Sequence, residues 1–254
     1  MVGLSETDEQ HCIEELKQNP RGEFLQAIRD NDLARCLIKT AEIHGHFCPG
    51  SALGVMASVY GLNLLGLDSI SSDGLEGLMA VVEINACFAD GVQAVSGCTL
   101  GNNALVYRDL GRMAVTFAIR GRETAVRIRV RPDFSSSVAK AAPEFYPLME
   151  MVIKNRMGGT EEKAAFRNAG RQAAFGIILL PFDELFSLET VKPLLPEYAP
   201  ITESVFCGNC GEMIMATKAV DGLCLICAGN EYRQVEGSGI VSKRPARRSS
   251  SIKS

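Results

Sequence analysis

Three side chains that commonly bind metals lie within five residues of one another: His44, His46 and Cys48. Imidazole and thiolate are preferred ligands of zinc, iron and copper, so their spacing on a loop with glycine and proline predicts a metal or ligand site. The same atoms could form a nucleophile and its base, with Cys48 activated by His46. A structural interpretation is also open, in which the histidines cap the preceding helix and Cys48 is a small buried hydrophobic side chain.

A second group of reactive side chains follows a predicted buried strand. Cys87 ends that strand, Asp90 and Gln93 lie three residues apart on one face of a predicted helix, and Cys98 and Thr99 come next. Along a straight helix, at about 1.5 Å per residue, Cys87 and Cys98 would lie roughly 16 Å apart. They share one ion only if the helix is short or the chain folds back. We therefore expect Cys87 to join the His-Cys loop.

Four further cysteines form two Cys-x2-Cys pairs, Cys207 with Cys210 and Cys224 with Cys227. Two such turns can complete a tetrahedral metal site. The surrounding unit, from Ile201 to Tyr232, is too short to bury a core, so a metal would supply most of its folding free energy. A thioredoxin-like redox pair would need a βαβ context, which the surrounding sequence does not indicate. The spacing predicts a structural site, and zinc is favoured over iron because closed four-thiolate sites most often hold zinc.

The spacing of apolar residues and helix-ending residues predicts the elements that position these groups. Helices are expected over residues 24–44 with a break near Asn31, 49–65, 90–95, 136–156 and 160–176. Strands are expected over residues 77–87, 113–120, 124–131 and 183–191, and the middle two form a hairpin. Small residues between 51 and 58 would let a neighbouring element pack very closely.

These elements predict an α+β fold with an antiparallel or mixed sheet packed against helices, plus a small C-terminal zinc-ribbon domain. The expected division is an N-terminal extension over 1–22, a core domain over 23–192, a proline-rich linker over 193–200, the four-cysteine domain over 201–234 and a disordered basic tail over 235–254. In the second hairpin strand Arg127, Arg129 and Arg131 alternate with apolar residues. We expect a solvated or salt-bridged face there, and an anionic substrate or a partner subunit is the alternative.

Composition and charge narrow the classes of partner. The chain of 254 residues has a net charge of −4. Five of its 26 bases but only one of its 30 acids lie in the last 19 residues, so residues 1–235 have a net charge of −8 and are a poor match for nucleic acid. The first residues show no basic and apolar leader, and the longest apolar run, 173–182, is far shorter than the roughly 20 residues that span a bilayer. We expect a cytoplasmic protein that binds neither nucleic acid nor membrane. Nine cysteines in that compartment indicate metal or redox chemistry.

Two motifs in the core resemble a known family. His44–Gly50 (HGHFCPG) and Cys87–Gly101 (CFADGVQAVSGCTLG) together look like the signature of the FmdE family of formylmethanofuran dehydrogenase subunits. The four-cysteine unit is similar to the zinc ribbon that many members carry. The resemblance implies an α+β domain, a homodimer, and a metal or ligand site built from His46, Cys48, Cys87 and Cys98.

We therefore expect a metal-binding protein linked to one-carbon or molybdenum/tungsten enzyme metabolism. As an enzyme or part of one, it would use zinc or iron to polarise a carbonyl or activate water. The ligands would be His46, Cys48 and Cys87, with His44 as a further candidate. Asp90 would orient a ligand or move a proton, and Gln93 and Thr99 would position substrate.

The alternative is a non-catalytic accessory module. It would bind a metal, a molybdenum- or tungsten-type cofactor or an oxidoreductase partner subunit, and the zinc ribbon would serve as the docking element. Coordination separates the two: three protein ligands with an open position favour the enzyme, and a closed four-ligand site favours the module.

Overall fold

The computed structural model describes residues 14, 17–66 and 75–245, which form two compact units divided between Leu195 and Pro196. The division falls inside the segment 193–200 that the sequence assigns to a linker. Most of the predicted N-terminal extension and the end of the predicted tail, residues 246–254, lie outside the described residues.

Local capping signals set the helices that carry the His-Cys loop. The predicted helix over 24–44 is confirmed with its break, as α2 (Gly22–Arg29) and α3 (Leu33–His44). Asp32 caps α3, because its side chain accepts a hydrogen bond from the Arg35 amide. The next helix, α4 (Pro49–Leu65), begins at a proline and ends before Gly66, as predicted.

A five-stranded mixed sheet forms the other layer of the first unit and confirms the α+β class. Its strand order is β2-β1-β3-β4-β5, with β1 and β2 parallel and the other neighbours antiparallel. The strands are β1 (Leu78–Val82), β2 (Leu105–Tyr107), β3 (Ala114–Ile119), β4 (Ala125–Val130) and β5 (Phe186–Val191). The β3–β4 hairpin confirms the prediction, whereas the three-residue β2 has no counterpart in it. The strand expected over 77–87 is shorter: it ends at Val82, residues 83–86 form a bend, and Cys87 begins α5 (Cys87–Ser96).

Helix α4 is the centre of the first unit, since 13 of its 17 residues are buried. It packs so closely on α5 that a Cβ added to Gly54 would lie 2.2 Å from the Phe88 carbonyl oxygen. A Cβ added to Gly91 of α5 would lie 2.5 Å from the Ser51 carbonyl oxygen. The close packing expected from the small residues is thus confirmed, and it brings the N-terminal ends of α4 and α5 together.

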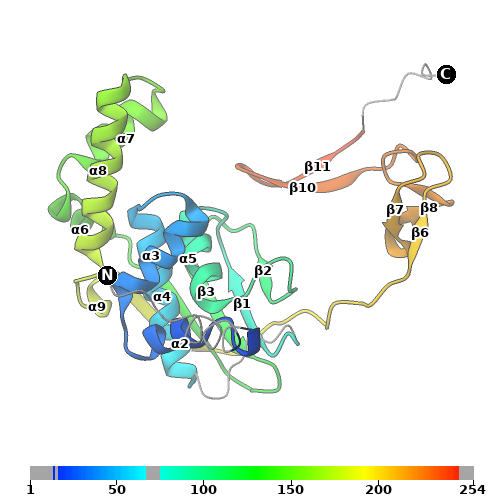
Figure 1. Cartoon of the computed structure of the whole chain (residues 1–254), viewed down its shortest axis with the longest axis horizontal. Helices are drawn as coiled ribbons and strands as arrows, with labels where there is room; N and C mark the ends of the chain where they lie inside the picture. Colours follow the sequence, from blue (N-terminus) through cyan, green and yellow to red (C-terminus); the bar gives the residue numbers. More distant parts are fainter. Residues whose placement is uncertain (1–13, 15–16, 67–74, 246–254) are drawn as a thin grey trace. The chain divides into compact units, whose positions relative to one another are not determined.

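The helix predicted over 136–156 is wrong as a continuous element. It divides into α6 (Phe134–Ala141), α7 (Phe145–Met149) and a π-helical turn, η2 (Glu150–Lys154). The division comes at Pro143, which disfavours a helical conformation of the preceding Ala142, and Ala142 has φ −148° and ψ 87°. These three elements pack against α8 (Thr160–Ile177) (Figure 1). Helix α8 confirms the helix predicted over 160–176. A short helix, α9 (Phe182–Leu185), takes the place of the first residues of the last predicted strand.

The alternating arginines form a salt-bridged face. Arg127 donates two hydrogen bonds to the buried Glu83, at 2.8 and 2.9 Å, and a third to Glu189 at 3.2 Å. Arg129 also contacts Glu189, at 3.0 Å. The hydrogen bond from Arg127 is the main cause that lowers the pKa of Glu83, against the opposing effect of burial. This pairing accounts for Arg127 and Arg129 without an anionic ligand.

Over its described residues, 196–245, the second unit contains three small antiparallel pairs and a 3-10 turn, η3 (Ala216–Lys218). The pairs are β6 (Ser204–Phe206) with β7 (Met213–Met215), β8 (Ala219–Val220) with β9 (Leu223–Cys224), and β10 (Tyr232–Glu236) with β11 (Gly239–Lys243). The sequence predicted disorder over residues 235–254, but the last pair gives residues 235–243 a regular structure. Val235 pairs with Ile240 around a tight Gly-Ser turn, so local strand pairing prevails over the polar composition. None of the helices in the described part of the chain combines the length and apolar character needed to cross a membrane.

Candidate metal centres

The His-Cys loop connects two helices in the first unit. His44 is the last residue of α3, and Gly45 ends that helix with a left-handed φ of 80°, which favours glycine. The turn then presents His46 at the surface and leads to the buried Cys48, the N-cap of α4. One ligand atom from each of His44, His46 and Cys48 lies within 4.8 Å of the other two. The three predicted ligands therefore converge.

His44 is held in the orientation of a metal ligand. Its Nδ1 donates to Asp90 Oδ2 at 2.7 Å, and its Nε2 lies 3.5 Å from Cys48 Sγ. A nitrogen and a sulfur bound to one tetrahedral zinc ion would lie about 3.5 Å apart, given bond lengths of about 2.0 and 2.3 Å. A carboxylate behind the other ring nitrogen is the usual support of a metal-binding histidine. Burial disfavours the imidazolium, but Asp90 and the Cys48 thiolate together outweigh it and raise the pKa of His44.

Cys87 comes from the start of α5 and lies beside Cys48. A hydrogen bond between the two thiols is the main cause that lowers the pKa of Cys48 and raises that of Cys87. Burial opposes the Cys48 thiolate, but the Ser51 hydroxyl and amide also stabilise it, with the amide nitrogen 3.4 Å from Sγ. A Cβ added to Gly50 would lie 3.0 Å from the Cys87 Cβ. A metal bound by both sulfurs would require both thiols to lose their protons.

The structure separates Cys98 from this cluster. Helix α5 lies between Cys87 and Cys98, and the buried Cys98 thiol donates to the Leu78 carbonyl oxygen at 3.6 Å. Burial raises the pKa of Cys98 to about 11. The structure likewise places Thr99 in a turn, where its amide donates to Asn102 Oδ1 at 2.8 Å. The site role that the sequence assigned to Cys98 has no support in this geometry, because the intervening helix is ten residues long.

Two pairings in the cluster differ from the sequence interpretation. Cys48 contacts His44, whereas the sequence interpretation paired it with His46 as the base. Gln93 was expected to position substrate, but its amide donates to Asp90 Oδ1 at 3.3 Å and so steadies the carboxylate behind His44. Ser51 was missed altogether, and its place in the first turn after Cys48 was the only signal for it in the sequence.

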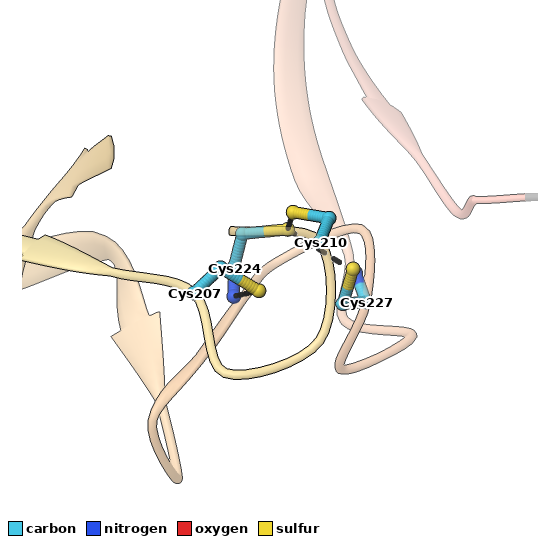
Figure 2. Close-up of side chains that lie close together, drawn as sticks. All are labelled: Cys207, Cys210, Cys224 and Cys227. Carbon is cyan, nitrogen blue, oxygen red and sulfur yellow. Dashed lines mark hydrogen bonds between the residues drawn. The ribbon is translucent and has the colours of Figure 1, made fainter. Parts of the chain in front are cut away.

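The second centre is the four-cysteine unit (Figure 2). The ligand sulfurs of Cys207, Cys210, Cys224 and Cys227 all lie within 4.8 Å of one another. The Cys210 and Cys224 sulfurs are 4.0 Å apart, close to the about 3.8 Å expected for two sulfurs on one tetrahedral zinc. Backbone amides of Cys224 and Cys227 donate to Cys207 and Cys224 sulfurs at 3.2 and 3.4 Å. Such hydrogen bonds, led by that of the Cys210 amide, lower the pKa of Cys207 to about 6.

Both donor sets fit a borderline or soft transition metal. The C-terminal set offers four thiolates from two facing turns, which makes a closed site. The core set offers two imidazoles and a thiolate, with the Cys87 thiol beside it and the exposed His46 on its outer side. The fold and these groups define an α+β protein with two candidate metal-binding centres.

Comparison with known proteins gives the family. The family model described as FmdE, molybdenum formylmethanofuran dehydrogenase operon, matches residues 43–187, and the chain belongs to this family. The match contains the complete His-Cys cluster and ends before the four-cysteine unit.

Two individual proteins are also similar. A protein of Archaeoglobus fulgidus described as a probable S-adenosyl-L-methionine-binding protein is 41% identical over 223 residues, or 87% of this chain. The chain spans 59% of that relative's length. A crystal structure of a tungsten formylmethanofuran dehydrogenase FmdE-like protein from Syntrophus aciditrophicus is 22% identical, with a TM-score of 0.45 over 78% of this chain and 92% of that chain.

Proposed function

We propose that this FmdE-family protein binds a transition metal, zinc or iron, at the His-Cys cluster, and a structural zinc ion in the four-cysteine unit. The observation that carries the core site is the orientation of His44. Asp90 fixes Nδ1, so the lone pair of Nε2 is directed towards Cys48 at the separation that two ligands of one ion adopt.

The core site suits an enzyme or a component of one. When bound, the metal would supply Lewis acidity to an oxygen-containing substrate of one-carbon or molybdenum/tungsten metabolism. In this role Asp90 holds the proton on His44 Nδ1, Gln93 orients Asp90, and the exposed side of His46 leaves room for a ligand from solvent. Homodimer formation and docking to an oxidoreductase partner are further parts of the proposal.

A non-catalytic accessory module is the second candidate, and the position of Cys87 favours it. Cys87 lies outside the group of ligand atoms that His44, His46 and Cys48 form, but its thiol contacts Cys48. A rotation of Cys87 that brings its sulfur into this group would give a closed site with a structural metal. The protein would then act by docking to, or carrying a cofactor for, a partner enzyme.

Metal analysis of the purified full-length chain tests whether the core site exists. We expect about two metal equivalents per chain, one from each centre. The double substitution Cys207→Ser with Cys210→Ser should remove one and leave the other, and Cys48→Ser should do the reverse. Cys36→Ala is the matched control, because this buried cysteine of α3 belongs to neither centre. A single equivalent in the wild type that disappears with the ribbon cysteines would refute the core metal.

Cobalt substitution separates the two candidate functions. In the Cys207→Ser/Cys210→Ser protein, cobalt would report the core site alone through its visible absorption bands. Addition of a small anion such as azide should shift these bands if a coordination position is open, as the enzyme requires. Bands that do not move would favour the accessory module.

A further inference from the structure

We propose that Cys48 and Cys87 form a reversible disulfide that controls whether the core site can hold a metal. The inference rests on the proposed function, because it names the regulation of that same site. It concerns only the two thiols that α4 and α5 bring together.

The two thiols are adjacent although they lie 39 positions apart in the sequence. The two thiols share a hydrogen bond. The backbone two residues after Cys48 also lies against Cys87, since a Cβ added to Gly50 would be 3.0 Å from the Cys87 Cβ. Each lies where extended backbone enters a helix: Cys48 is the N-cap of α4, and Cys87 follows the extended Ala86 at the start of α5. A disulfide requires the two Cα atoms to lie within about 7 Å of each other, with side-chain rotations that bring the sulfurs to about 2.05 Å.

Exposure also distinguishes this pair from the other core cysteines. Cys87 is half-buried, which gives a small oxidant access, and Cys48 is 8% exposed. Cys36 and Cys98 are both completely buried. Burial raises the pKa of Cys36 to about 12, so this thiol is unreactive. Among these four core cysteines, oxidation should therefore be selective for the Cys48–Cys87 pair.

The chemistry uses a hydroperoxide as the oxidant and balances in two steps. The Cys48 sulfur attacks hydrogen peroxide, an S–O bond forms, the O–O bond breaks and hydroxide leaves. The Cys87 sulfur then attacks the Cys48 sulfur and displaces a second hydroxide, which leaves as water with the Cys87 proton. The two cysteines lose two electrons to the peroxide, and an external dithiol returns them by thiol–disulfide exchange. Since a metal ligand must be a thiolate, the disulfide leaves the site with only its imidazoles.

Peptide mapping of the full-length protein tests the inference. The chain is stripped with a chelator, treated with hydrogen peroxide, alkylated, and cut with Glu-C and trypsin. Cleavage after Glu42, Glu76, Glu83 and Arg108 isolates Cys48 in peptide 43–76 and places Cys87 and Cys98 in peptide 84–108. We expect these peptides to be joined through Cys87 and released by dithiothreitol. Zinc-loaded protein should form the link at least about tenfold more slowly, because its thiolates are engaged.

Two variants sharpen the result. Cys98→Ala should form the same link, because this buried thiol takes no part. Cys87→Ser should leave a sulfenic acid on Cys48 that dimedone traps, which does not depend on disulfide geometry. Peptides that remain unlinked, or that join only through Cys98, would overturn the inference.

The inference and the proposed function fail separately. If the core site binds metal but no Cys48–Cys87 link forms, only the redox control is wrong. If the link forms in a chain that binds no metal at the core site, the disulfide is supported, and the proposed function and the control of metal binding are wrong.

Discussion

Substitution of Gly54 by alanine should damage both the core and the metal site. Gly54 lies in α4 where the helix meets α5, and its added Cβ would be 2.2 Å from the Phe88 carbonyl oxygen and 3.1 Å from the Gly91 Cα. These are backbone atoms, so no side-chain rotation can relieve the contact. Restoring a separation of even 3.0 Å requires α4 and α5 to move apart by about 0.8 Å.

The expected cost follows from two opposing effects. Overpacking a well-packed core costs about 1–3 kcal/mol, and the upper end applies because the clash is with backbone. Alanine in place of glycine within a helix returns about 1 kcal/mol. We expect a net loss of about 2 kcal/mol in the free energy of unfolding. The same displacement separates Cys48, the N-cap of α4, from Cys87 at the start of α5, and so disturbs the core metal site.

Urea denaturation and metal analysis measure the two effects on one preparation. Gly77→Ala is the matched control, because its Cβ would meet no atom within 4 Å, and we expect it to change stability by less than about 0.5 kcal/mol. The Gly54→Ala protein should also lose core metal and retain the metal of the four-cysteine unit. A Gly54→Ala protein that is as stable as the wild type and binds the full complement of metal would refute the close-packing argument.

Two further predictions concern carboxylates of the first unit. Asp90→Asn should weaken metal binding at the core site by about 10–100-fold, measured by competition with a chromophoric chelator, because His44 loses the support of a carboxylate; unchanged affinity would contradict this role. Glu83→Gln should cost about 3 kcal/mol in urea denaturation, since Arg127 would lose its buried partner, whereas the exposed Glu123→Gln should cost little. The pKa of Glu83 is lower in the folded than in the unfolded protein. The carboxylate therefore contributes its full share of the free energy of unfolding above its ordinary pKa near 4.5, and this share is lost as the pH falls further. Equal loss of stability in acid for the wild type and the Glu83→Gln protein would contradict this.

Elements with strong local signals were predictable from the sequence. Asp32, Pro49 and Gly66 mark helix ends through backbone preferences that act within a few residues, and the corresponding helices begin or end beside them. The β3–β4 hairpin followed from alternation of apolar and charged residues. Pro143 is a local signal too, but the surrounding apolar pattern favoured a continuous helix, which the proline breaks.

Elements that depend on distant partners were not predictable in this way. The strand β2 has three residues, and it exists because β1 offers a parallel neighbour. The pairing of Arg127 with Glu83 also joins residues far apart in the chain, although the alternating charges made a salt-bridged face an expectation.

The side chains that could bind metal can be identified from the sequence, because ligand type and short spacing are local properties: His44, His46 and Cys48 on one loop, and the four cysteines in two turns. Which other residues join them depends on how the helices pack. The glycine contact between α4 and α5 brings Cys87 to Cys48, the rotation of α5 turns Asp90 towards His44, and the length of the same helix carries Cys98 away. The positions of these three residues relative to the His-Cys loop depend on how the helices pack, and the spacing of residues along the sequence does not predict that packing.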